Sequence, residues 1–293
     1  MPPPLAIADP DGDADGATGA GVGAVVALKA GELVKSRLAP LPQPLRRRLA
    51  WTMAVDTLHA LVRAVATVCV VSDQPGLAHR LARAGLGSVE VVAEVAPAGL
   101  NEALRVGADH LREVGLPRVL ACVGDLPALR PRSVATVLAA AAAYGRAYVP
   151  DATGIGTTML LAGEGVALAP HFQGRSAAAH HSSGATPLTD DRLGAAVPDA
   201  RRDVDTEVDL GDAAGLGVGP ATRALLEPGS GRLGTYAVVT TTGRHGPDGS
   251  AVTTDGVRVS LPDDHLADGL RTLRPGQRLH AVLAGTTVLS AWL

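Results

Sequence analysis

Apolar residues gather in short unbroken runs along the chain, and longer amphipathic segments separate these runs from Gly23 onward. This alternation is typical of repeated strand–helix units around a mostly parallel sheet. The runs are unbroken because helices would cover both faces of such a sheet. The predicted strands span residues 24–28, 67–71, 89–93, 119–123 and 147–149. We therefore predict an α/β fold, with helices on both faces of the sheet that include residues 44–62, 77–83, 101–114 and 132–144.

The same pattern divides the chain into regions. Residues 1–22 contain no long apolar stretch and are predicted to be a disordered tail. The α/β domain is predicted at residues 23–215, since Gly and Pro accumulate beyond it and the hydrophobic periodicity is lost. Residues 216–232 are predicted to be a linker. Residues 233–293 contain short β-rich runs between Gly-containing turns at hairpin spacing, which predicts a small all-β barrel domain.

The predicted barrel resembles the cold-shock-like branch of the OB-fold in the pattern of its turns. The resemblance rests on Gly-Thr at 234–235, Asp-Gly at 255–256 and Arg-Pro-Gly-Gln-Arg at 274–278. Nucleic-acid-binding members stack bases on aromatic side chains of one sheet face, but this region contains only Tyr236 and Trp292. We therefore expect a structural or interaction role for the barrel rather than RNA binding.

Composition narrows the classes of function. The net charge is −3 and 46% of the 293 residues are hydrophobic, so the charge balance does not favour nucleic acid as a partner. The first residues have neither a basic segment nor an apolar one, which argues against a signal peptide or a membrane anchor. Cys69 and Cys122 each lie in an apolar run and are expected in the core. Two such cysteines provide no disulfide framework, which fits a cytoplasmic protein.

Candidate functional residues come shortly after the predicted strands, because ligands of such sheets bind beyond the carboxyl ends of the strands. These residues are Lys29, Asp73, Asp125 and Asp151.

The loop after the first strand carries three cations within nine positions. Lys29 and Lys35 would supply point charges to phosphate groups, and Arg37 would offer a planar fork to pairs of oxygens. Main-chain amides of a turn, here around Ser36, bind further phosphate oxygens. The loop therefore predicts phosphate binding, with a solvated basic loop as the alternative.

Three aspartates predict a metal site. Asp125 follows the fourth strand, and Asp203 and Asp205 are two residues apart, so in an extended segment both would point to one face. Magnesium prefers a few carboxylates together with water and substrate phosphates. Thr206 and Asp209 match a capping box, so helix initiation explains this part of the segment but not the aspartate pair.

Several short motifs in one order carry a family resemblance. They are Lys29, Lys-Ser-Arg-Leu at 35–38, Gly-Leu-Asn at 99–101, Gly-Asp-Leu-Pro at 124–127, Gly-x-Gly-Thr-Thr at 154–158 and Asp-Val-Asp-Thr at 203–206. Over about residues 23–215 the chain resembles the CofC/FbiD-like family of 2-phospho-L-lactate and phosphoenolpyruvate guanylyltransferases. The resemblance implies a Rossmann-like nucleotidyltransferase domain that joins the GMP part of GTP to a small phosphorylated acid.

The resemblance also implies a metal cofactor and a biosynthetic pathway. It makes Asp125, Asp203 and Asp205 ligands of Mg²⁺, Lys29, Lys35 and Arg37 catalytic, and the reaction a step in coenzyme F-420 biosynthesis. The GC-rich composition suggests an actinobacterial source, for which the expected acceptor is phosphoenolpyruvate; 2-phospho-L-lactate and 3-phosphoglycerate are the alternatives. An oligomer and a contact with a downstream pathway enzyme are open.

Two rival interpretations also stay open. One is a nucleotidyltransferase of another substrate class, such as a molybdopterin or sugar-phosphate enzyme. The other is an inactive nucleotide-binding or interaction protein that uses the barrel to contact a partner.

The acceptor side of the site follows from the resemblance as well. Thr157 or Thr158 is implied to contact the acceptor. The next acceptor segment is usually Phe-Gly-x-x-Ser-x-x-x-His, and here Gln173 stands where glycine is usual. A required positive φ would be unfavourable for Gln173 or would shift the role to Gly174. Ser176 is expected to cap the following helix and to offer amides to the acceptor.

Two further residues have alternative explanations. Gly99 and Asn101 open a predicted helix, where the Asn101 side chain would either read the base or ribose or cap the helix. His180 is expected to be structural or a neighbour of the acceptor phosphate rather than a metal ligand, because magnesium favours oxygen ligands.

Overall fold

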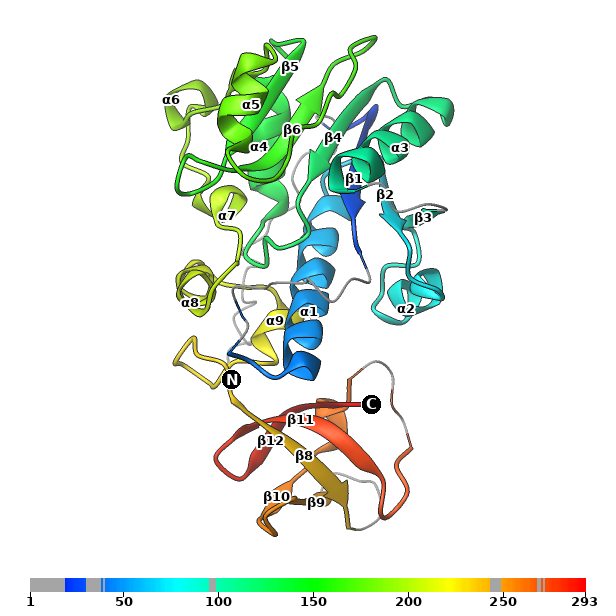
Figure 1. Ribbon diagram of the computed structural model, residues 1–293, viewed down its shortest axis with the longest axis vertical. Helices are drawn as coiled ribbons and strands as arrows, with labels where there is room; N and C mark the ends of the chain where they lie inside the picture. The colour runs from blue at the N-terminus through cyan, green and yellow to red at the C-terminus, as the bar shows by residue number, and fades with distance from the viewer. Residues whose placement is uncertain are drawn as a thin grey trace, which may run out of the picture.

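The computed structural model describes residues 19–29, 38, 40–94, 99–242, 249–267, 270 and 272–293. Within these residues a seven-stranded sheet with helices on both faces lies above a small closed barrel (Figure 1). The prediction of an α/β domain followed by an all-β barrel is confirmed. None of the helices in the described segments has the length and apolar character needed to cross a bilayer.

The strand order of the sheet is β3-β2-β1-β4-β6-β5-β7. Strand β1 pairs in parallel with β2 and β4, so that Val25 lies between Cys69 and Ala121. The strands are β1 (Val22–Ala27), β2 (Thr67–Ser72), β3 (Glu90–Ala93), β4 (Arg118–Cys122), β5 (Arg146–Pro150), β6 (Thr157–Ala162) and β7 (Thr186–Pro187).

Strand β6 was not predicted. It runs antiparallel to both β4 and β5, and it begins at the threonine pair that the sequence assigned to the acceptor site. Both faces of this strand are buried, so its residues form one apolar run after two threonines rather than an alternating pattern. The acceptor motif therefore lies at the start of a central strand.

Four helices agree with the predicted ranges to within a few residues. They are α1 (Gln43–Val62), α2 (Leu77–Arg83), α3 (Leu100–Glu113) and α4 (Pro131–Ala141). The ranges of the other helices were not predicted: α5 (Ser176–Ser182), α6 (Asp190–Leu193), α7 (Pro198–Arg201), α8 (Glu207–Leu216) and α9 (Pro220–Arg223).

Alternate residues of β1 point into two different cores. Val26 packs with Leu58 of α1 and Val134 of α4 on one face, and Val25 packs with Leu104 of α3 on the other. Gly107 lets α3 approach the sheet closely, because a Cβ there would lie 2.3 Å from a methyl carbon of Val25. This arrangement explains why the strands have unbroken apolar runs.

Both cysteines lie in these cores, as predicted. Cys69 and Cys122 are free and buried. Burial, with a smaller contribution from Glu90, raises the pKa of the Cys69 thiol to about 12. Burial also raises the pKa of the Cys122 thiol. Neither thiol is therefore a nucleophile at neutral pH.

The segment at 216–232, predicted to be a linker, contains α9 and buried apolar side chains. The carboxylate of Asp56 on α1 accepts hydrogen bonds from the amides of Ala221 (3.0 Å) and Thr222 (2.8 Å). These amides belong to the first turn of α9, so Asp56 satisfies donors that a helix start leaves without intrahelical partners. Leu225 and Leu226 are buried. The segment is thus packed tightly against α1.

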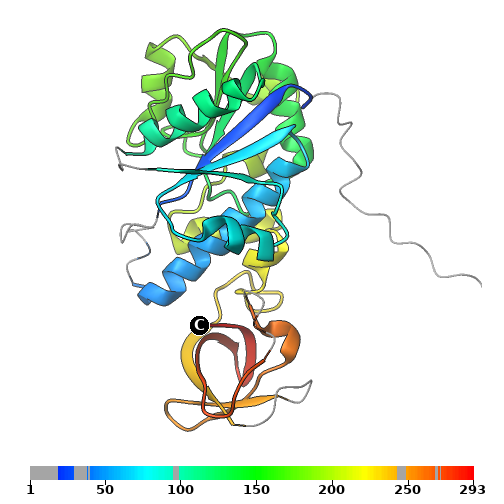
Figure 2. The same cartoon turned by 90° about the vertical axis from the view of Figure 1, so that its right-hand side faces the viewer.

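The barrel contains five strands in the closed order β10-β12-β11-β8-β9. Strand β10 is parallel to β12, and the other pairs are antiparallel. Figure 2 shows the barrel as a ring below α1. The cold-shock-like subtype stays a prediction. The strands are β8 (Thr235–Thr241), β9 (Ser250–Thr253), β10 (Arg258–Ser260), β11 (Arg278–Ala284) and β12 (Thr287–Trp292).

Candidate active site

A main-chain hydrogen bond brings the distant aspartates together. The amide of Val204 donates to the carbonyl oxygen of Asp125 over 3.1 Å. Val204 is fully buried, whereas Asp203 and Asp205 on either side of it are half-buried. The buried residue of this segment is thus the valine, and the two aspartates that flank it are the residues with partly exposed surface. The structure therefore places the pair beside the end of β4.

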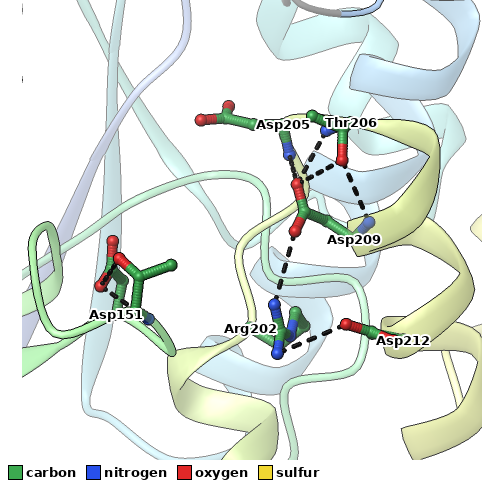
Figure 3. Close-up of polar contacts among 7 residues, drawn as sticks. Asp151, Arg202, Asp205, Thr206, Asp209 and Asp212 are labelled. Carbon is green, nitrogen blue, oxygen red and sulfur yellow. Dashed lines mark hydrogen bonds and ion pairs between the residues drawn. The ribbon is translucent and has the colours of Figure 1, made fainter.

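The capping box predicted after the pair is confirmed. Thr206 is the N-cap residue of α8, and its hydroxyl accepts a hydrogen bond from the amide of Asp209 (3.2 Å). The Asp209 carboxylate accepts in return from the amides of Thr206 (2.9 Å) and Asp205 (3.2 Å). Arg202 lies 3.4 Å from both Asp209 and Asp212. Figure 3 shows the carboxylate of Asp205 pointing away from this network.

The same segment is also tied to the acceptor motif. Ala200 accepts a hydrogen bond of 2.6 Å from the Thr158 hydroxyl through its carbonyl oxygen. The carbonyl oxygen of Arg201 accepts from the amide of Ala152 at 2.8 Å. Helix α7, which ends two residues before Asp203, thus joins the acceptor motif to the segment of the aspartate pair. The sequence did not reveal the role of α7, because its contacts with the acceptor loop are made through its main-chain carbonyl oxygens.

The three aspartates do not form a ready-made metal cage. In the part of the chain that the structure describes, no group of three or more His, Cys, Asp or Glu side chains is arranged to hold a metal ion. Their chemistry nevertheless fits Mg²⁺, which takes one or two carboxylates and completes its shell with water and substrate phosphates. The donor set therefore suits a cation that arrives with a phosphate ligand.

Lys29 lies at the carboxyl end of β1 and pairs with a carboxylate that the sequence did not reveal. Its ammonium donates to both carboxylate oxygens of Glu94 at 2.6 Å. The Glu94 side chain is only 5% exposed, compared with 27% for Lys29, so the pair is largely shielded from water. Glu94 directly follows the third predicted strand, and the rule that marked Lys29 and Asp125 could have found it.

Lys35, Ser36 and Arg37 lie outside the described residues. The predicted phosphate role of this loop stays a prediction.

A large cavity opens beside Lys29, Gly124 and Asp125 and extends along α1, with a volume of about 1190 Å³. This volume exceeds the range of about 300–1,000 Å³ that is typical of small-molecule sites. The cavity lies beyond the carboxyl ends of β1 and β4, where ligands of such sheets bind.

The acceptor motif is a loop held by one carboxylate. One oxygen of Asp151 accepts from the amides of Thr153 and Ile155, both at 3.0 Å, and the other accepts from the amide of Gly156 at 2.9 Å. A Cβ on Gly156 would lie 2.4 Å from that second oxygen. The glycine at position 156 thus has a steric explanation of its own.

The two threonines of the motif are both engaged. Thr158 is fully buried, and its hydroxyl donates to Ala200 as described above. The hydroxyl of Thr157 is hydrogen-bonded to Nδ1 of His180 at 2.9 Å. Nε2 of His180 accepts from the amide of His171 at 2.8 Å, so the neutral ring carries its proton on Nδ1 and donates to Thr157.

His180 has the structural role expected for it. The ring is fully buried and packs edge-on against Phe172 at a centroid distance of 5.1 Å. Burial, followed by the charges of His171 and Arg146, lowers the pKa of His180 to about 4. The ring is therefore neutral at physiological pH.

Asn101 binds the acceptor segment rather than capping its helix. It is the second residue of α3, whose N-cap residue is Gly99 at φ = 100°, so the capping interpretation is wrong. Its side-chain oxygen accepts from the amide of Phe172 at 2.7 Å, and its amide nitrogen donates to the Phe172 carbonyl oxygen at 3.2 Å. This pair of bonds fixes the main chain next to Gln173. The base or ribose contact stays a prediction.

Gln173 occupies a conformation that favours glycine. Its φ is 84°, and φ of the following Gly174 is 60°. The positive φ considered from the sequence is thus present at the glutamine itself, at a cost of about 1–2 kcal/mol. Ser176 is the first residue of α5, and Arg175 is the N-cap residue, so the expectation that Ser176 caps this helix is wrong. Ser176 is 2% exposed.

Comparison with known proteins places these features in a family. The chain is 44% identical over 206 residues to a phosphoenolpyruvate guanylyltransferase of Salinispora arenicola, covering 69% of this chain and 91% of that protein. It is 45% identical over 205 residues to the Streptomyces coelicolor protein of the same name, covering 69% and 93%. The chain belongs to the phosphoenolpyruvate guanylyltransferase family. Within this family the Mycolicibacterium smegmatis protein is 40% identical over 222 residues, covering 74% of this chain and 96% of that one. No family model matches the chain.

Solved structures show more distant likenesses. A nucleotidyl transferase from Methanothermobacter has a TM-score of 0.45 at 20% identity and covers 67% of this chain and 97% of that one. A Mycobacterium homologue of the Mycobacterium tuberculosis protein Rv0371c has a TM-score of 0.47 at 19% identity, covering 67% and 96%.

Proposed function

We propose that this protein transfers GMP from GTP to phosphoenolpyruvate, forming enolpyruvoyl-diphospho-guanosine and releasing diphosphate. Membership of the guanylyltransferase family supports the reaction class. The observation that carries the proposal is the 3.1 Å hydrogen bond from Val204 to Asp125, which brings the Asp203/Asp205 pair to the carboxyl end of β4. Membership of the family also supports the proposal that the reaction is a step of coenzyme F-420 biosynthesis and takes place in the cytoplasm.

The reaction needs no covalent enzyme intermediate. A phosphate oxygen of the acceptor attacks the α-phosphorus of GTP, and the bond between this phosphorus and the bridging oxygen to the β-phosphate breaks in line. The electron pair of that bond leaves with diphosphate. Because the acceptor phosphate is already a nucleophile, catalysis consists of positioning the reactants and neutralising charge.

Residues at the ends of β1 and β4 supply the charge. Asp125, Asp203 and Asp205 would hold Mg²⁺, which when bound neutralises developing charge on phosphate oxygens. Lys29 faces the same region as a point charge, and its pairing with Glu94 keeps the ammonium in one place. Lys35 and Arg37 complete the proposed set of cations around the triphosphate.

Contacts to the two substrates come from two sets of residues, which the hydrogen bonds between Asn101 and Phe172 join. On the nucleotide side we assign Lys29, Ser36, Gly99 and Asn101. On the acceptor side we assign Thr157 or Thr158, Gln173, Gly174 and Ser176. The hydrogen bond from the Phe172 amide to the Asn101 side-chain oxygen supports this assignment indirectly, because it fixes the main chain that precedes Gln173 and Gly174.

Product identification tests the proposal. The purified protein would be incubated with GTP, MgCl₂ and one acceptor at a time, namely phosphoenolpyruvate, 2-phospho-L-lactate or 3-phosphoglycerate. Mass spectrometry of the products is expected to show the enolpyruvoyl-diphospho-guanosine adduct as the fastest-forming product. A faster reaction with either other acceptor would reassign the substrate. GTP binding without diphosphate release with any acceptor would favour an inactive nucleotide-binding protein instead.

A further inference from the structure

The large cavity beside Asp125 does not end within the α/β domain. At one end it is lined by Lys29 and Asp125, and at the other by His280, Trp292 and Leu293 of the barrel. Figures 1 and 2 both place the C-terminus on the side of the barrel that faces α1. The barrel is therefore a wall of the cavity that contains the proposed reaction centre.

Trp292 holds this wall against α1. Its side chain is 6% exposed and belongs to the same buried cluster as Leu45 and Leu49 of α1. The guanidinium carbon of Arg48 lies 5.6 Å from the centre of the Trp292 ring. A cation over an aromatic face is attracted to it, which adds to the apolar burial. Arg48 is thus positioned by the barrel.

A second aromatic contact stiffens the same face of the barrel. The hydroxyl of Tyr236 is hydrogen-bonded to Nδ1 of His280 at 2.7 Å, and the two rings are stacked at a centroid distance of 5.9 Å. The His280 ring also lies 5.9 Å from that of Trp292. These aromatic side chains lie at the junction with α1, so a base-stacking surface is not their main use here.

The cavity between the barrel and the helices is rich in arginine. Arg47 and Arg48 of α1 and Arg80 and Arg83 of α2 line it. The guanidinium carbon of Arg80 lies over the Trp51 ring, 3.7 Å from its centre. Guanidinium groups offer planar forks that match pairs of phosphate oxygens. The lining favours a multiply charged anion.

The geometry of α1 sets the reach of such an anion. The helix rises about 1.5 Å per residue, so the cavity spans about 20 Å along it from Asp56 to Gln43. Asp56 lies at the Asp125 end but is engaged with the amides of α9, whereas the arginines lie toward the barrel. By the same rise, Arg48 and Arg47 lie about 12 and 14 Å from Asp56, so a phosphate chain that starts near Asp125 reaches them by extending along α1.

We propose that the barrel completes the nucleotide site, and that the part of the cavity between Arg47, Arg48 and Trp292 binds the β- and γ-phosphates of GTP and the diphosphate that leaves. This inference rests on the proposed function, which supplies the triphosphate. It gives the barrel a positioning role in the reaction, through Trp292 and Arg48.

Binding of inorganic diphosphate tests the inference on the full-length chain. Isothermal titration calorimetry in the presence of Mg²⁺ is expected to show about tenfold weaker binding for Arg47→Met, since one charge-assisted contact is lost. Arg258→Met is the matched control, because it removes an exposed arginine from β10 outside the cavity, and it should bind within about twofold of the unaltered protein. Unchanged binding by Arg47→Met would overturn the inference.

The barrel's role is tested separately by two variants at Trp292. Trp292→Leu is expected to raise KM for GTP about tenfold, while KM for the acceptor changes less than about twofold. Trp292→Phe keeps an aromatic face for Arg48, so its KM for GTP should be close to that of the unaltered protein. Equal rises in both KM values would indicate a general structural defect and would contradict the positioning role.

The two proposals fail in different ways. If the unaltered protein binds diphosphate through Arg47 but makes no product with GTP and any acceptor, the proposed function is wrong and the anion site remains. If it makes product but Arg47→Met and Trp292→Leu behave like the unaltered protein, only the role of the barrel is wrong.

Discussion

The two halves of the candidate site are built in different ways. At the aspartate half, a main-chain hydrogen bond from the buried Val204 to Asp125 brings the segment that carries Asp203 and Asp205 to the end of β4. At the acceptor half, the polar side chains themselves hold the fold together, as Asn101 does for Phe172 and His180 for Thr157.

This difference predicts which substitutions separate activity from stability. A carboxylate at the aspartate half can be changed while the main-chain contact that positions it persists. A polar side chain at the acceptor half cannot be removed without leaving a buried group without its hydrogen bond, which costs about 1–3 kcal/mol. Substitutions at the aspartate half should therefore lower activity with little loss of stability, whereas substitutions at the acceptor half should lower stability.

The largest expected effect is on activity at the aspartate half. Asp205→Asn should lower kcat/KM about 100-fold, because the amide is a poor ligand for Mg²⁺ and cannot neutralise it. The melting temperature should stay within about 2 °C, since asparagine keeps the main-chain amide that bonds to Asp209. Asp264→Asn, at an exposed position of the barrel, is the control and should change neither quantity. A large loss of stability with Asp205→Asn would contradict the proposed difference between the two halves of the site.

An effect of similar size, on stability, is expected from pH through His180. The folded state holds the pKa of this ring at about 4, below the ordinary value of 6.5, so the unfolded chain binds the proton more readily. Stability should therefore fall as the pH drops from about 6.5 to about 4, by up to about 3 kcal/mol.

Urea unfolding at several pH values measures this contribution. His180→Gln should flatten the dependence between pH 6.5 and 4. The adjacent exposed residue supplies a matched control, and His181→Gln should leave the dependence as it is. A slope that persists in His180→Gln would assign the pH dependence to other groups.

Asn101→Ala should act on stability and binding together. The change leaves the amide and carbonyl of Phe172 without their side-chain partner, so the free energy of unfolding should fall by about 2 kcal/mol. KM for the acceptor should rise as well, because the main chain at Gln173 loses its support. Asn101→Asp keeps only the oxygen acceptor. Its free energy of unfolding and its KM for the acceptor should therefore lie between those of the unaltered protein and those of Asn101→Ala. Urea unfolding and steady-state kinetics measure the two quantities. An alanine variant of unchanged stability would contradict this account of the acceptor half.

The smallest expected effect is a gain at Gln173. Glycine adopts φ = 84° without steric cost, so Gln173→Gly should stabilise the protein by about 1 kcal/mol. The reciprocal change Gly174→Ala, at φ = 60°, should destabilise it by a similar amount. Thermal melts of both variants measure the difference. A loss of stability with Gln173→Gly would show that the glutamine side chain makes a compensating contact.

Periodicity and strand-end rules predicted much of this molecule from its sequence. Helix ranges such as 77–83 and the capping box of Thr206 with Asp209 follow from local patterns that tertiary packing did not override. The barrel followed from turn spacing.

What sequence reasoning missed depends on contacts between distant segments. Asn101 looked like a helix cap because the local pattern allows it, but its partner is Phe172, and no local rule connects the two. Strand β6 was not predicted, because Thr157 and Thr158 were interpreted as acceptor contacts and the apolar run after them was not interpreted as a strand. The pairing of Lys29 with Glu94 needed the order of strands in the sheet, which periodicity does not give.

The most direct test of the central claim is Asp125→Asn, measured for both diphosphate release and stability. The account predicts at least about 100-fold slower diphosphate release from GTP and phosphoenolpyruvate, with a free energy of unfolding within about 1 kcal/mol of the unaltered protein, because the main-chain carbonyl that accepts from Val204 is kept. Near-normal diphosphate release by the folded variant would contradict the assignment of the aspartates as the reaction centre.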